Sequence, residues 1–265
     1  MRSLQAIGYT PEMANAAWGN YSSMVLPLFH MPQVLLTPIA YATLPALRSH
    51  VARGDVREAE QLMKSALTVT AIVSALAALG LSLFSYDALQ LLYTDQDAVA
   101  RAYPKLALVS LAIFPLGLVT TASTLLQAFG KLWTPTVAFA IGACVKIFVT
   151  LALTEMLGES VSPWGTLLSY TVTAALDLAL LSQKLPLALS AVTLKPFFVA
   201  GVSVLGAVFV RAVLTQASLS ARLVSVLSIG VAALLALGLA VLTRAIKEED
   251  LLVFGIAVKP RRKKQ

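Results

Sequence analysis

The chain has 265 residues, of which 58% are hydrophobic and only 12% are charged, and its mean hydropathy is +0.82. Soluble domains average nearer ~45–50% apolar and ~25% charged residues, so one water-soluble core cannot bury this many apolar side chains. The composition excludes a soluble enzyme, a disordered tail and a disulfide scaffold. It predicts a protein whose apolar surface is covered by a lipid bilayer.

Seven apolar runs are long enough to cross a bilayer as α-helices, each of which needs about 20 residues. In chain order, these predicted crossings are residues 22–47, 65–84, 106–128, 134–156, 163–181, 196–214 and 223–242. The sequence thus predicts an all-α, polytopic integral membrane protein with about seven transmembrane helices. The membrane domain covers residues 1–243, and a basic cytoplasmic tail covers residues 244–265.

Prolines and glycines predict where these helices bend or stop. Prolines are tolerated in membrane helices because neighbouring groups satisfy the carbonyls that they leave free. The first crossing contains four prolines, and the third contains one. A glycine between the third crossing and Lys131 is typical of a helix end. The candidates for a helix break or hinge are Pro32, Pro45, Pro115, Gly130 and Gly142.

The distribution of Lys and Arg predicts the orientation of the chain in the membrane. If the C-terminus is cytoplasmic, 14 of the 20 basic residues lie inside, five lie outside, and Lys146 lies within the membrane. Cytoplasmic loops of membrane proteins carry such an excess of Lys and Arg. The net charge of +7 therefore reflects the orientation of the chain in the membrane and does not indicate a nucleic-acid partner. The polar first twenty residues would then lie outside without a signal-peptide core, which suggests that a further crossing precedes Met1.

Two charged residues within the predicted crossings are the main candidates for a substrate path. A charge in mid-membrane costs roughly 2.5–3.5 kcal/mol on insertion scales and is a functional hypothesis by default. Lys146 lies about a dozen residues, or ~18 Å, into the fourth crossing, and Asp177 lies in the fifth, nearer the cytoplasmic end. Lys146 is interpreted either as a cation for a phosphate-bearing substrate, tuned by Asp177, or as part of a structural ion pair between helices.

Polar uncharged residues and other motifs add little chemistry. Gln127 lies at the end of the third crossing. Gln33 lies beside Pro32, where it either forms hydrogen bonds between helices or donates a hydrogen bond within a cavity. Arg211 lies near the outer end of its helix and is expected to extend its charge to the interface. The two histidines lie on different segments, so no metal site and no cofactor are predicted. No nucleotide-binding or hydrolase motif is present, and the chain is not expected to be an enzyme.

The order of several short motifs resembles a known transporter family. The segments are IGYT at 7–10, WGNY at 18–21, LLQAFGK at 125–131, IGACVK at 141–146 and GTLLSY at 165–170. The chain resembles the later half of the stage V sporulation protein B and polysaccharide transporter family. That family belongs to the multidrug/oligosaccharidyl-lipid/polysaccharide flippase superfamily.

This resemblance implies a flippase of about fourteen helices in two lobes that alternate access around a central cavity. The chain is similar to helices eight to fourteen, so a first lobe would be missing. Lys146 matches the lysine of the eleventh helix, whereas Thr150 stands where that family often has asparagine. The implied function is the flipping of undecaprenyl-linked polysaccharide or peptidoglycan precursors across the bacterial cytoplasmic membrane.

Two alternatives stay open at this point. A multidrug or cation exporter of the same superfamily would favour acidic and aromatic cavity residues, whereas the deep charge here is a lysine and aromatic residues make up 8% of the chain. A non-transporting membrane fragment or scaffold is the second alternative. The expected partners are the bilayer, a lipid-linked sugar substrate and a missing N-terminal lobe.

Overall fold

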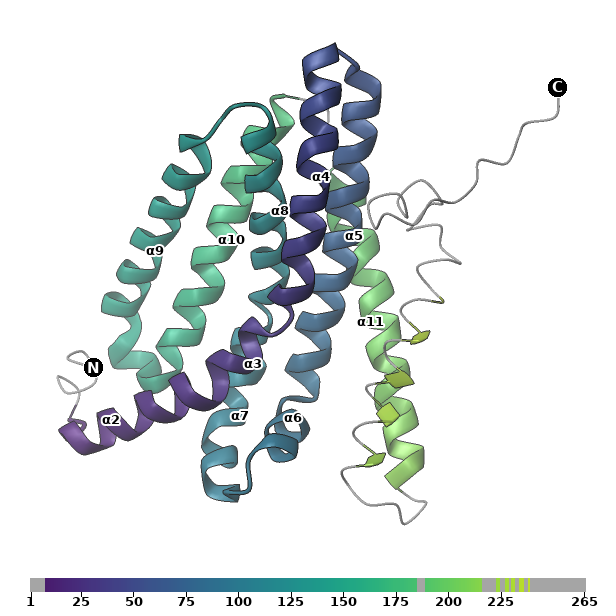
Figure 1. Cartoon of the computed structure of the whole chain (residues 1–265). Helices are drawn as coiled ribbons and strands as arrows, with labels where there is room; N and C mark the ends of the chain where they lie inside the picture. Colours follow the sequence, from purple (N-terminus) through teal and green to yellow (C-terminus); the bar gives the residue numbers. More distant parts are fainter. Residues whose placement is uncertain are drawn as a thin grey trace.

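The computed structural model describes residues 8–184 and 189–215, together with isolated positions between 223 and 238. Every regular element in these ranges is a helix, and the longer ones form a bundle (Figure 1). The elements are α2 (Pro11–Asn20), the π-helical turn η1 (Tyr21–Val25), α3 (Leu26–His30), α4 (Gln33–Arg53), α5 (Val56–Leu83), α6 (Ser85–Leu92), α7 (Gln96–Ser110), α8 (Ile113–Ala128), α9 (Trp133–Leu157), the 3₁₀ turn η2 (Gly158–Ser160), α10 (Val161–Ser182) and α11 (Leu189–Leu214).

Three helical stretches are long and apolar enough to cross a membrane, and two bent helix pairs raise the number to as many as five. One stretch, Trp133–Ser182, contains both α9 and α10, which run antiparallel beside each other (Figure 1). The all-α membrane fold is therefore confirmed. Six predicted crossings fall on described helices, and the seventh, 223–242, lies largely outside the described residues.

Two apolar clusters hold the bundle together, one toward each end. The first joins α4, α5, α8 and α10 around Leu47, Met63 and Leu125, which are fully buried. The second joins η1, α3, α7 and the start of α8, with Phe29 and Leu106 at its centre. Membrane helices associate through such packing and through interhelical hydrogen bonds. The hydroxyls of Thr70 and Thr121, 2.8 Å apart, provide one such bond between α5 and α8.

Two of the predicted proline positions coincide with helix breaks. The first crossing bends by 41° between α3 and α4, where Pro32 directly precedes the new helix, and the third bends by 42° between α7 and α8. The second break falls at Leu111, four residues before Pro115, which has no N–H to donate to the carbonyl of Leu111. Pro45 lies inside the unbroken α4.

Glycines end two of the helices. Gly54 and Gly130 have φ of 75° and 74°, a left-handed conformation that glycine adopts without strain. After α8, the N–H of Lys131 donates to the carbonyl of Leu126 and that of Gly130 donates to Gln127, both at 3.1 Å. This is the Schellman pattern, which satisfies the last carbonyls of a helix. The α4–α5 and α8–α9 turns, which these two glycines begin, lie at the same end of the bundle (Figure 1).

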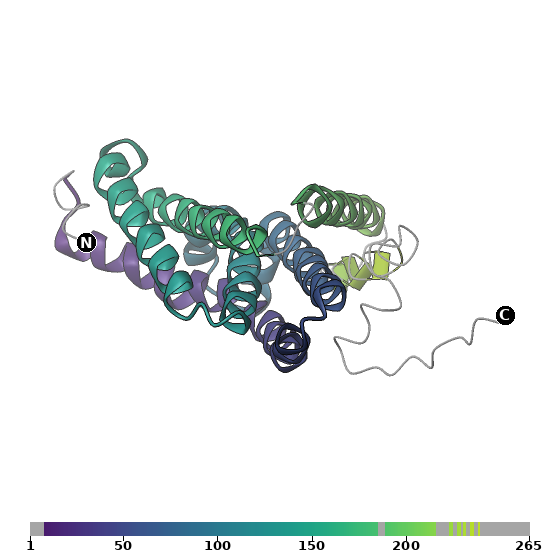
Figure 2. The ribbon, with the colours of Figure 1, turned by 90° about the horizontal axis from the view of Figure 1, so that it is seen from above.

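Helix α11 packs on α5, on the side of the bundle away from α9 (Figure 2). Val204 and Ala207 of α11 are buried against Phe84, with Leu76 and Leu79 of α5 beside them. The rest of α11 is largely exposed, and Phe198, Leu205 and Phe209 are examples. A lipid-facing helix of a membrane protein has this distribution, because lipid covers the apolar side chains that the bundle does not.

Candidate functional site

Lys146 lies in the middle of α9, on an exposed part of the helix surface. A methyl group built on Gly165 of α10 would lie 3.4 Å from the Cγ atom of Lys146, so the aliphatic stem of the lysine runs beside this glycine. No ion pair involves Lys146 within residues 8–184 or 189–215. The structure thus presents an ammonium group at mid-helix without a carboxylate partner from the described chain.

Gly142 sets the distance between α9 and α10. A methyl group at this position would lie 2.1 Å from Oγ1 of Thr173 and 2.9 Å from the carbonyl oxygen of Ser169, so the two helices are in close contact here. Gly142 therefore acts as a packing residue in this structure and lies within the unbroken α9. Small residues allow this close approach of backbones in membrane helix pairs.

The register of the hairpin separates Lys146 from Asp177. Gly142 faces Thr173 and Thr150 faces Gly165, which places Asp177 opposite Ala138. Ala138 precedes Lys146 by eight residues, or about 12 Å along the helix. The ion pair that the sequence left open between Lys146 and Asp177 is accordingly not formed in the described part of the chain.

Asp177 is completely buried between α10 and α8. Its neighbours Ala174 and Leu178 belong to the apolar cluster of α4, α5, α8 and α10. Oδ2 accepts a hydrogen bond of 2.6 Å from the hydroxyl of Ser123, whereas Oδ1 has no partner among the described residues. A buried carboxylate with one unsatisfied oxygen is costly, and such groups within membranes are functional candidates.

The two glutamines lie apart from these charges. Gln127 is half-buried in the last turn of α8, just before the helix end at Gly130. Gln33 begins α4, and its Oε1 lies 3.3 Å from Nδ1 of His30. This contact spans the break at Pro32 and joins the ends of α3 and α4. Within the described part of the chain, no hydrogen bond or ion pair joins any two of Lys146, Asp177, Gln127 and Gln33.

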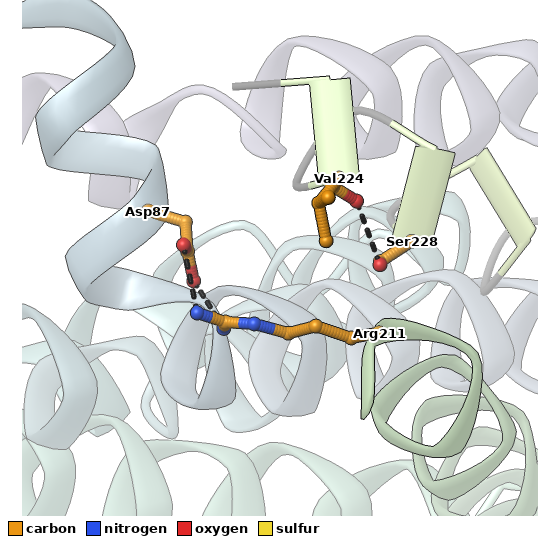
Figure 3. Close-up of polar contacts among 4 residues, drawn as sticks. All are labelled: Asp87, Arg211, Val224 and Ser228. Atoms are coloured by element: carbon orange, nitrogen blue, oxygen red, sulfur yellow. Dashed lines mark hydrogen bonds and ion pairs between the residues drawn. The ribbon is translucent and has the colours of Figure 1, made fainter. Parts of the chain in front are cut away.

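Two ion pairs that the sequence does not indicate join distant elements. Arg211 of α11 donates to Asp87 of α6 through both terminal guanidinium nitrogens, Nη1 to Oδ2 and Nη2 to Oδ1, the latter at 3.0 Å (Figure 3). The guanidinium also lies 5.7 Å from the ring centre of Phe84. Lys105 of α7 pairs with Glu159 of η2 and is 7% exposed. Arg211 is therefore held by a carboxylate rather than extended freely to the interface.

Sequence spacing gives no signal for these pairs, because their partners lie 124 and 54 residues apart. In the sequence, Asp87 and Glu159 look like ordinary residues of outer loops. Only the packing of α11 and α7 brings Arg211 to Asp87 and Lys105 to Glu159. Ser123 was missed for the same reason. A serine in an apolar helix carries no distinguishing pattern until its neighbour is known.

Together the fold and the charges buried within it define a polytopic, all-α membrane protein. The family model described as "Lipid II flippase MurJ" matches residues 11–228, and the chain belongs to this family. The family is part of the multidrug/oligosaccharidyl-lipid/polysaccharide flippase superfamily, so the superfamily expected from the sequence motifs is confirmed. The match falls on the lipid II branch, and membership of the sporulation branch is not supported. No curated protein and no solved structure matches the chain significantly.

Proposed function

We propose that the chain takes part in flipping undecaprenyl-linked peptidoglycan or polysaccharide precursors across the bacterial cytoplasmic membrane, with its C-terminus on the cytoplasmic side. The match to the lipid II flippase family over residues 11–228 is the observation that carries this proposal. In this function the chain forms one lobe beside a hydrated cavity, with a further N-terminal lobe as its partner. Rocking of the lobes would alternate access, as in other transporters with repeated halves.

Lys146 is the residue through which we propose that the chain attracts the substrate headgroup. Its ammonium group has three donors, and the described chain pairs it with no carboxylate. A pyrophosphate-bearing headgroup supplies the missing negative charge, while the lipid tail stays in the bilayer. Charge-assisted hydrogen bonds contribute roughly 1.5–3 kcal/mol, which corresponds to a change of about 10- to 100-fold in binding.

Replacing this ammonium tests the proposal. We expect Lys146→Ala to lower translocation of a lipid-linked precursor in proteoliposomes by about 10-fold or more, and Lys146→Arg to restore part of it. Lys131→Ala is the matched control, because this lysine is exposed in the α8–α9 turn. Membrane insertion, measured by the yield of folded protein, should be equal for all variants. Normal translocation by Lys146→Ala would refute the role.

Competition distinguishes this function from the alternatives. A lipid-linked sugar should compete with the translocated precursor, and a cationic dye should not. Competition by the dye alone would favour a multidrug or cation exporter. If neither compound is moved and no variant changes the result, the chain is a scaffold without transport activity.

A further inference from the structure

Two buried carboxylates of the bundle differ in their partners. The side chain of Asp87 is 6% exposed and accepts hydrogen bonds from both terminal nitrogens of Arg211. Asp177 has no exposed surface, and its Oδ2 accepts one hydrogen bond of 2.6 Å, from the hydroxyl of Ser123. Its Oδ1 has no partner among the described residues. The described chain thus supplies a cation to Asp87 and none to Asp177.

The helices that lie closest to Asp177 bring no charged side chain to it. Helix α8, which lies between α4 and α10 (Figure 1), has no titratable residue in its sequence. The residue of α9 opposite Asp177 is Ala138, and Lys146 lies about 12 Å farther along that helix. Within α10, the nearest titratable group is Tyr170, seven residues or ~10 Å before Asp177.

On α4, α5 and α7, every charged or titratable side chain is exposed or has another partner. The partly or fully buried ones are paired, namely Lys64 with Glu60, Lys105 with Glu159 and His50 with Asp55. No side chain of these helices therefore neutralises Asp177 within the part of the chain that the structure describes.

A proton is the ligand that fits these surroundings. The flanking residues Ala174 and Leu178 belong to the apolar cluster of α4, α5, α8 and α10. An isolated carboxylate is costly in apolar surroundings, and addition of a proton removes the charge without adding volume. A metal ion would need several oxygen ligands, whereas the described chain contributes one hydroxyl beside the carboxyl group. A neutral carboxylic acid therefore suits the packing of Asp177 better than a carboxylate or a metal complex.

Helix α8 offers a route by which this proton reaches water. Thr120, Ser123 and Gln127 follow one another at three- and four-residue spacing, so they lie on one face of the helix. All three residues are half-buried, in contrast to the completely buried Asp177. The hydroxyl of Ser123 belongs to this face and also donates to Asp177. It can therefore relay a proton between water and the carboxyl group.

We propose that Asp177 is a proton-binding site that exchanges with water through Ser123 and couples precursor translocation to proton movement. On binding, hydronium gives up its proton, an O–H bond forms at Oδ1, and a water molecule remains; release reverses these steps. Only the coupling rests on the proposed function, because the site itself follows from the contacts of Asp177. This role is separate from that of Lys146, which attracts the headgroup.

Infrared spectroscopy of the full chain in nanodiscs at neutral pH tests the site. A neutral carboxylic acid has a carbonyl stretching band separate from the bands of carboxylates, and exposed or ion-paired Asp and Glu side chains are ionised at this pH. We expect the parent to show this band, Asp177→Asn to lose it, and D2O to shift it. Asp87→Asn is the matched control, since Asp87 is also buried but ion-paired, and should retain the band. Ser123→Ala should retain the band and slow its shift in D2O several-fold.

The contrary results are equally defined. Absence of the band in the parent, its persistence in Asp177→Asn, or a band that does not shift in D2O would overturn the proton site, and an unslowed shift in Ser123→Ala would overturn the route. Translocation in proteoliposomes tests the coupling: a gradient with the acidic side outside should accelerate the parent several-fold and leave Asp177→Asn unchanged. An equal response of the two proteins would overturn the coupling. Failure of the proposed function is a separate observation: the band and its exchange then remain, but the protein translocates no lipid-linked precursor.

Discussion

Asp177 illustrates how a single residue can oppose the stability of the bundle. Its carboxylate is completely buried and receives one hydrogen bond, from Ser123. Burial of a charge with so few partners costs several kcal/mol after relaxation, and a neutral group of similar shape removes this cost. Proteins retain unfavourable groups of this kind mostly where function requires them. We therefore interpret Asp177 as a functional residue rather than as a device for joining α8 to α10.

Exchange of this carboxylate for an amide separates the two roles. We expect Asp177→Asn to leave the Tm unchanged or higher, because the amide oxygen still accepts from Ser123 and no buried charge remains. Translocation of the lipid-linked precursor should fall by about 10-fold, the loss of roughly 1.4 kcal/mol from one charge-assisted contact. Ser123→Ala is the comparison and should lower the Tm. Full transport by a stable Asp177→Asn protein would show that the carboxylate is structural.

Gly142 is a second position where one atom decides the packing. We expect Gly142→Ala to destabilise the α9–α10 hairpin by about 1–3 kcal/mol, the usual cost of overpacking, because its methyl group overlaps Thr173 and approaches the backbone of Ser169. Thermal unfolding in detergent measures this change. Gly80→Ala is the control, since a methyl group there meets no atom within 4 Å. Equal Tm values for both variants would contradict the close contact.

At the scale of elements, the bends in the first and third crossings show how proline acts in a helix. Pro32 and Pro115 accompany breaks, whereas Pro104 lies within the unbroken α7. A proline in a helix interior removes one hydrogen bond, and the surrounding helices influence how far the chain bends there. At Leu111 and Ala112, the amides donate to carbonyls three residues earlier, at 3.3 and 2.9 Å, and the helix restarts at Ile113.

Restoration of one amide tests this account. We expect Pro115→Ala to provide a donor for the carbonyl of Leu111 and to continue α7 into α8. Hydrogen exchange of the peptide covering 111–116 should slow by at least 10-fold, which corresponds to about 1.4 kcal/mol of protection. Pro104→Ala serves as the control and should leave exchange at 111–116 unchanged. Rapid exchange at 111–116 in Pro115→Ala would mean that neighbouring helices impose the break without the proline.

At the scale of the whole molecule, α11 is joined to the bundle mainly through its packing against α5. An apolar strip around Val204 and Ala207 meets α5, and Phe114 packs on Phe197 with ring centres 4.3 Å apart. The bidentate contact between Arg211 and Asp87 secures the opposite end of the helix (Figure 3). Bidentate pairs of this type fix geometry as well as energy, so this contact holds the end of α11 against α6.

The unequal burial of this pair predicts unequal effects of its two truncations. The side chain of Asp87 is 6% exposed and that of Arg211 is 36% exposed. Arg211→Ala should cost on the order of 2 kcal/mol, because a buried carboxylate loses its guanidinium, and Asp87→Ala should cost less, because the arginine can reach water or headgroups. The double variant should be more stable than Arg211→Ala alone.

Thermal unfolding and hydrogen exchange along α11 measure these effects. The exposed Arg101 supplies the control, and Arg101→Ala should change neither quantity. Equal losses in both single variants, with no recovery in the double variant, would show that the contact contributes little to the docking of α11.

The sequence alone determined the fold class, the apolar runs that form the described helices and the helix end at Gly130. These features follow from local properties: the length of apolar runs, and the freedom of glycine to adopt positive φ. It also singled out Lys146 and Asp177, because charges are rare within apolar runs. The tertiary structure decided which residues meet. It separated Lys146 from Asp177, paired Asp177 with Ser123 and Arg211 with Asp87, and made Gly142 a contact between helices. Register and rotation of packed helices depend on the fit of many side chains at once, and no single run of sequence contains that information.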